Sequence, residues 1–123
     1  MKMKEMYTVA LYRDENGQCY VFHTKGKLNQ VEIFEEQFLK VNNYKMETCV
    51  VTTEKIVALK ARLKFRIEEL KALDRTVDHY GYDQVVIDQV GLLTARLLNE
   101  GVDVTDEVAL QCYDIRQRNR AGI

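Results

Sequence analysis

Hydrophobic residues in the second half of the chain recur at helical spacing. Six of them form one stripe, here called the leucine ridge: Ile56, Leu59, Leu63, Leu70, Leu73 and Val77. Four of these are seven residues apart and the other two follow at a spacing of three, which places all six on one side of a helix. We expect Thr52 or Thr53 to cap this helix and the helix to run to about residue 77 or 78, a length of roughly 37 Å. Because the chain offers only two short helices and a few strands to cover such a stripe, the ridge predicts self-association into a homo-oligomer.

Two shorter helices are predicted after the ridge. Gly81 ends the long helix, and Asp83 is the expected N-cap of the next one. The stripe of that helix comprises Val86, Val90, Leu93 and Leu97, and further apolar residues widen it at Val85, Ile87, Leu92 and Leu98. This breadth indicates a helix between two surfaces. Gly101 follows its end, and Thr105 is the expected N-cap of the last helix.

The first half of the chain predicts a small antiparallel sheet. Segments 7–12 and 19–24 are rich in β-formers, and Asn16-Gly17 between them is a strong hairpin signal. Asn29 and Glu32 form a capping-box pattern at the start of a helix. The buried face of this helix is expected to comprise Val31, Phe34, Phe38 and Val41, and residues 45–51 are expected to form a third strand. The prediction is therefore one α+β domain, with a β-β-α-β half over residues 1–51 and a helical half over 52–123.

Composition and charge exclude several classes of protein. Of the 123 residues, 46% are hydrophobic and 30% are charged, which is typical of a globular domain, and the formal net charge is -1. This charge disfavours a general nucleic-acid binder. The three cysteines are far apart and odd in number, which disfavours a disulfide framework or zinc site and favours a reducing cytoplasm; each is expected to be a small buried hydrophobe. No N-terminal signal peptide and no membrane span are predicted, because no apolar stretch approaches about 20 residues.

Motifs for catalysis are lacking. The sequence has no G-x-S-x-G, no phosphate loop ending in Gly-Lys-Ser/Thr and no H-E-x-x-H. His23 and His79 are widely separated, and we interpret them as ordinary strand and helix-end residues. We therefore expect no metal, no cofactor and no enzymatic activity. An enzyme acting on nucleotides stays a minor alternative, which would need His23, His79 or Asp83 as its base.

Several arginines and tyrosines are candidates for ligand binding. Arg66 takes a ridge position where an apolar residue is expected, and Arg62 lies one turn earlier on the same side. Arg66 either lays its aliphatic stem along the core or faces a pocket for an anionic ligand. Tyr80 and Tyr82 flank Gly81, where they either cover the end of the helices or stack against a nucleobase.

The C-terminal helix carries a cluster of basic residues, Arg116, Arg118 and Arg120. These arginines complement the helix dipole, and their forked donors would also suit phosphate. Asn99, at the end of the preceding helix, could read a base edge or a ribose, although a helix-end residue needs no ligand to explain it.

The layout resembles a family of phage Thoeris anti-defence proteins, which sequester cyclic ADP-ribose-type immune signals at a subunit interface. The segment MYTVALYRDENGQCYVFHT followed by the helix from Lys55 to Asp74 carries the resemblance, which covers the whole chain in architecture but includes no diagnostic motif. The resemblance implies aromatic, asparagine and arginine contacts to phosphates and base. Asn99 and Arg116 match that pattern in order and separation, and Tyr80 or Tyr82 would supply the aromatic contact.

Two functions follow as hypotheses. The leading one is a non-catalytic homo-oligomer that sequesters an anionic, nucleotide-derived small molecule between subunits, in the cytoplasm of an infected bacterial host if the chain is phage-encoded. The alternative is a small protein–protein interaction module, an inhibitor or adaptor, that docks its leucine ridge on another protein.

Overall fold

The computed structural model describes residues 5–73 and 81–122. Its elements are β1 (Tyr7–Arg13), β2 (Cys19–Lys25), α1 (Gln30–Val41), β3 (Lys45–Thr52), α2 (Lys55–Leu73), α3 (Tyr82–Asn99) and α4 (Glu107–Arg120). This order confirms the predicted α+β class and the β-β-α-β first half. The predicted end of the long helix, at residue 77 or 78, lies outside the described residues.

The three strands form one antiparallel sheet in the order β2-β1-β3. The predicted hairpin joins β1 to β2, and Gly17 takes the positive φ of 82° that its turn requires. The Asp14 carboxylate accepts hydrogen bonds from the backbone N–H groups of Asn16 at 3.0 Å and Gln18 at 2.8 Å. Such a side chain fixes the turn locally, which explains why the sequence predicted it.

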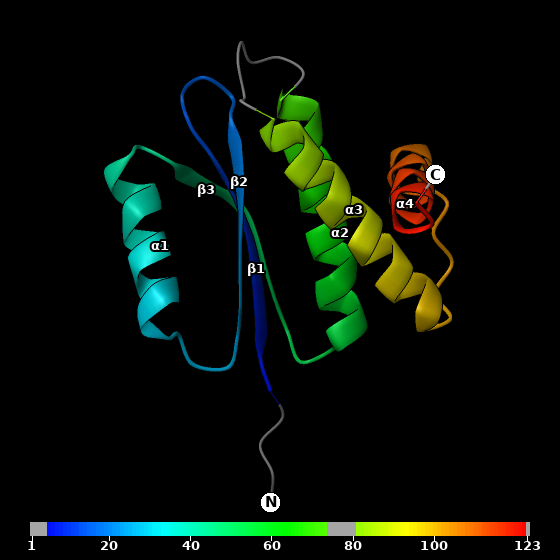
Figure 1. Ribbon diagram of the computed structural model, residues 1–123. Helices are drawn as coiled ribbons and strands as arrows, with labels where there is room; N and C mark the ends of the chain where they lie inside the picture. Colours follow the sequence, from blue (N-terminus) through cyan, green and yellow to red (C-terminus); the bar gives the residue numbers. More distant parts are fainter. Residues whose placement is uncertain (1–4, 74–80, 123) are drawn as a thin grey trace, which may run out of the picture.

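Helices cover both faces of the sheet (Figure 1). On one face Leu39 of α1 packs against Ala10, Tyr12 and Phe22. On the other face lies α2, with α3 and α4 beyond it. The central strand β1 is therefore buried from both sides.

The leucine ridge is covered within a single chain, which corrects the expectation that a second copy must shield it. Leu59, Leu63, Ile67 and Leu73 are buried in one cluster with the predicted stripe of α3, Val86, Val90, Leu93 and Leu97, while Ile56 and Leu70 are partly buried against it. The opposite side of α2 carries a second stripe of mostly small residues (Ala58, Ala61, Phe65 and Ala72) that packs on the sheet. Because both sides are apolar, α2 fits between the sheet and α3, and the ridge gives no basis for self-association.

The boundaries of the last two helices differ in detail from the prediction. Gly81, at φ 77°, is the N-cap of α3 rather than Asp83, which lies in the first turn. Asp106 rather than Thr105 caps α4, because its carboxylate reaches the backbone N–H of Ala109 at 3.0 Å. As predicted, α3 lies between two surfaces and contacts α2 and α4.

Helix α1 begins where predicted but faces the other way. Asn29 and Glu32 form the capping box, with hydrogen bonds of 2.9 and 2.7 Å between side chain and backbone N–H. The face expected to be buried is exposed, at 65% for Val31, 69% for Phe34, 53% for Phe38 and 80% for Val41. Leu39 is the buried residue of the helix. Helix α1 thus packs on the sheet through the side that carries Leu39. The helical period alone could not determine which side of the helix would be covered.

Candidate anion-binding pocket

A pocket of about 380 Å³ lies between strands β1 and β2 of the sheet and helices α2 and α3. Strand residues form one wall and helix residues the other; they are Tyr7, Val9, His23, Thr24, Lys25, Lys55, Ala58, Leu59, Arg62 and Arg96. This volume falls within the range of small-molecule sites, about 300 to 1,000 Å³.

Sequence periodicity explains how α2 presents an arginine here. Its two apolar stripes face the sheet and α3, so the residues between them emerge on two flanks. One flank holds Arg62, Arg66 and Glu69, which are spaced by four and three residues. His23 reaches the same region from β2, where it pairs with Val9 of the central strand. Arg96 comes from the last turn of α3.

The pocket carries an excess of positive charge. Lys25 and Lys55 are neutralised by Glu5 at 3.1 Å and Glu100 at 3.3 Å. Arg62 and Arg96 form no ion pair with any residue in the described ranges 5–73 and 81–122. Partial burial, together with the charges of Arg96 and then Arg66, lowers the pKa of Arg62 to about 10. Two such guanidinium groups repel each other unless an anion lies between them.

His23 adds a neutral polar group to this wall. Desolvation, followed by the positive charges of Arg62 and Arg66, lowers the pKa of His23 to about 4. The imidazole is therefore uncharged at neutral pH, with one nitrogen as a donor and the other as an acceptor. An anion bound beside it would oppose the arginine charges and raise this pKa.

The shifted pKa of His23 predicts a pH dependence of stability. Between its ordinary value of 6.5 and about 4, the unfolded state takes up the proton and the folded state does not, so stability falls as the pH drops through this window. Urea unfolding across this range is expected to show a shallower pH dependence for His23→Gln than for the unchanged protein. Identical slopes would contradict the depressed pKa.

The structure places the predicted site residues in different regions. Arg62 lines this pocket, whereas Arg66 donates to the Glu69 carboxylate at 2.6 Å, and Tyr82 donates to the same carboxylate at 3.1 Å. Arg66 and Tyr82 thus have structural partners. Tyr80 lies outside the described residues.

The residues implied by the resemblance are not gathered within one chain. Tyr82 and Asn99 are the first and last residues of α3, about 26 Å apart along the helix. Arg116 faces Asp88, with its Nε 3.4 Å from the carboxylate, and Arg118 pairs with Asp114 at 2.7 Å. A single small molecule cannot touch both ends of α3 in one subunit.

Sequence reasoning missed Arg96, Lys55 and His23 as pocket residues. His23 was interpreted as an ordinary strand residue because it has no neighbour at ligand spacing. Arg62 and Arg96 are 34 positions apart, and no local pattern links them. The available signal was weak: each arginine sits at the edge of an apolar helical stripe.

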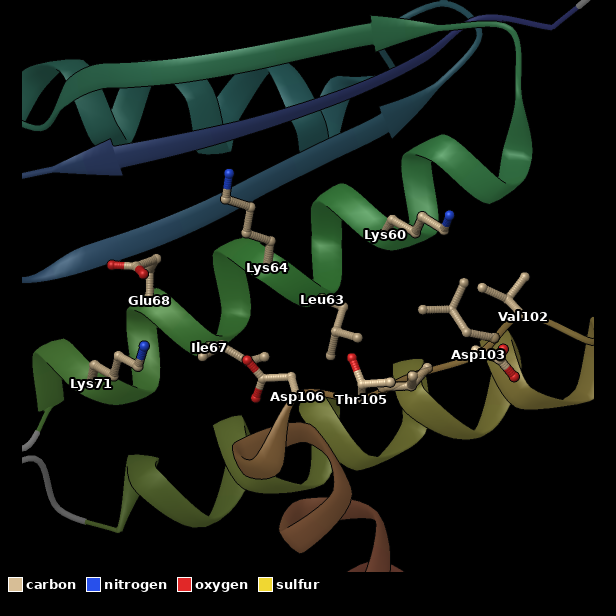
Figure 2. Close-up of a pocket in the computed structure, with 12 residues that line it drawn as sticks. Lys60, Leu63, Lys64, Ile67, Glu68, Lys71, Val102, Asp103, Thr105 and Asp106 are labelled. Atoms are coloured by element: carbon tan, nitrogen blue, oxygen red, sulfur yellow. The ribbon is translucent and has the colours of Figure 1, made fainter.

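A second cavity, of about 390 Å³, lies on the other flank of α2 (Figure 2). Lys60, Lys64 and Lys71 line it from α2, and Asp103 and Asp106 line it from the segment that leads into α4. Its charges have both signs, so it shows no preference for an anion. The arginine pocket is the better candidate.

Cysteines and metal ligands add no further site. Cys19 and Cys112 are buried, whereas Cys49 is exposed on β3, which corrects the expectation that all three are buried; all three thiols are free. Within the described residues no three histidine, cysteine or acidic side chains come together as metal ligands. None of the helices described is long and apolar enough to cross a bilayer.

Comparison with known proteins returned no match: no family model, curated protein or solved structure is significantly similar to this chain. The resemblance to the Thoeris anti-defence family therefore stays a prediction from the sequence.

Proposed function

We propose that this protein binds a small anionic molecule, of nucleotide size or smaller, in the pocket formed by His23, Arg62 and Arg96, without chemically altering it. The observation that carries the proposal is the pair of arginines without carboxylate partners in the described chain. Arg62 is partly buried and Arg96 is exposed beside it, and guanidinium groups bind phosphate and carboxylate through paired donors.

The chemistry of the lining supports a phosphate or a nucleotide over a purely apolar ligand. Tyr7 offers a planar ring at the pocket wall, and the Lys25 Nζ lies 6.0 Å from the centre of that ring. A base or sugar could lie on this surface while its phosphate meets the arginines. Among the described residues that line the pocket there is no carboxylate that would repel an anion.

The proposal keeps the anionic ligand of the sequence hypothesis but moves its site. The leucine ridge is covered by α3, so the pocket belongs to one chain and not to a cleft between ridges. Sequestration of a nucleotide-derived signal, the role implied by the resemblance, is one use of such a pocket. Docking of the ridge on another protein loses its basis for the same reason.

Isothermal titration calorimetry with inorganic pyrophosphate and with ADP tests the proposal. Arg62→Gln and Arg96→Gln are each expected to weaken binding by roughly 10- to 100-fold, because a charge-assisted hydrogen bond contributes about 1.5–3 kcal/mol. Arg118→Gln is the matched control, since this exposed arginine pairs with Asp114 outside the pocket. Absent binding of both probes, or equal affinities in all four proteins, would overturn the assignment.

A further inference from the structure

Helix α1 presents four of its six apolar residues to solvent, while its three glutamates are turned partly toward the rest of the protein. Val31, Phe34, Phe38 and Val41, here called the α1 face, are all more than half exposed. In contrast, Glu32, Glu35 and Glu36 are partly buried. A solvent-exposed helix surface normally has the reverse arrangement. An exposed apolar stripe of this kind typically marks an interaction site.

The α1 face is free of charge along its whole length. At 100° per residue, its four apolar residues fall within one third of the helix circumference, and the positions beside them on one margin are Gln30 and Gln37. The helix itself is well formed, with a complete capping box at its start. Its outward apolar stripe therefore belongs to an ordered element and is available as a rigid binding surface.

The order of residues on this face identifies the occupant. The α1 face has valine, phenylalanine, phenylalanine and valine at intervals of three, four and three residues, so it reads the same in both directions. When two such helices pack antiparallel about a two-fold axis, Phe34 of one copy lies opposite Phe38 of the other, and Val31 lies opposite Val41. A two-fold interface makes every contact twice, and with this order the phenylalanines meet at the centre and the valines meet at both ends. This match of like-sized side chains favours a second copy as the occupant.

We propose that α1 is the interface of a homodimer, in which it packs antiparallel against the same helix of a second copy. This inference is independent of the anion pocket, which lies on the other face of the sheet, beside α2 and α3. Self-association thus uses a helix face other than the leucine ridge that suggested it from the sequence.

A membrane surface fits the α1 face less well than a second copy. Helices that lie on anionic membranes carry lysine and arginine on their polar side. The polar side of α1 instead holds Glu32, Glu35 and Glu36 against one lysine, Lys40. This acidic side would be repelled by anionic lipid headgroups.

The size of the face sets the strength of the expected association. A helix of 12 residues is about 18 Å long and offers less than the roughly 800 Å² per partner of a standard stable interface. The dimer is therefore expected to dissociate on dilution. Multi-angle light scattering of the full chain over a dilution series is expected to show a change from dimer to monomer.

Charge substitutions test both the face and its antiparallel geometry. Phe34→Lys with Phe38→Lys places like charges opposite each other and is expected to raise the dimer dissociation constant by at least about 100-fold. Phe34→Lys with Phe38→Glu is expected to dimerise more tightly than the two-lysine variant, because each lysine then meets a glutamate across the two-fold axis. The exposed Val85 on α3 supplies the control, and Val85→Lys is expected to leave the dimer intact.

Circular dichroism and the urea unfolding transition establish that each variant is folded. A monomeric unchanged protein at every concentration would overturn the proposal. Equal dimerisation of the two-lysine variant and the unchanged protein would also overturn it. If the lysine–glutamate variant associates as weakly as the two-lysine variant, the antiparallel pairing is wrong.

Discussion

Replacing Glu69 with alanine is expected to lower the free energy of unfolding by about 3 kcal/mol, because it leaves a largely buried arginine without its counterion. Glu69 is 1% exposed, and its carboxylate accepts from Arg66 at 2.6 Å and from Tyr82 at 3.1 Å. Burial raises the pKa of Glu69, while the charge of Arg66 and the two hydrogen bonds act in the opposite direction. The three side chains form one network that connects α2 to the start of α3.

Urea unfolding of Glu69→Ala beside Glu68→Ala measures this effect. Glu68 is the neighbouring residue, its side chain is 43% exposed and its ion pair with Arg13 is 4.0 Å long, so its removal is expected to change stability by less than about 0.5 kcal/mol. Replacing both partners, with Arg66→Met and Glu69→Leu, is expected to recover most of the loss because no buried charge remains. Equal stabilities of the two alanine variants would refute the network's role.

Gly91→Ala is expected to lower the free energy of unfolding by about 2 kcal/mol, although alanine is the better helix former by about 1 kcal/mol. Gly91 is on α3 where α4 crosses it. A Cβ atom at this position would lie 2.7 Å from the backbone carbonyl oxygen of Cys112 and 3.1 Å from the Cβ of Arg116. The carbonyl belongs to helix α4 and cannot rotate away, so the whole helix must shift.

The same unfolding measurement tests whether the arginine chain beyond Cβ limits the approach. Gly91→Ala combined with Arg116→Ala is expected to stay destabilised, because alanine at 116 removes the Cδ contact at 3.2 Å but leaves the Cβ and the carbonyl oxygen of Cys112 in place. Gln84→Ala, at an exposed position of the same helix, is the control and is expected to be nearly neutral. Full recovery in the double variant would show that Arg116 and not the helix backbone limits the approach.

Local features of the fold could be predicted from the sequence. The hairpin depends on Asp14 and Gly17, which lie within the turn itself, and the start of α1 depends on Asn29 and Glu32, three positions apart. The buried stripe of α3 follows from its period, because Val86, Val90, Leu93 and Leu97 recur at intervals of three and four residues. In each case the groups that interact are a few residues apart, so the signal is present in a short segment.

The candidate site depends on contacts between residues that are far apart in the sequence. His23, Arg62 and Arg96 come from β2, α2 and α3, and they meet because α2 lies between the sheet and α3. Arg62 lines the pocket, whereas Arg66, one turn later and the residue for which a pocket was predicted, pairs with Glu69. One helical turn therefore separates a residue with a structural partner from one without.

Which segments become helices and strands follows from local sequence, because capping, turn formation and helical period act over a few residues. Which side of each amphipathic helix is covered depends on the packing of elements that are far apart in the chain. The second stripe of α2, with Ala58 and Ala61, allows close approach to the sheet, so the leucine ridge turns to α3 within the same chain. The α1 face is left outside because Leu39 fills the contact with the sheet. Periodicity shows that a helix has an apolar side, but the shape and area of the surfaces available decide what covers it.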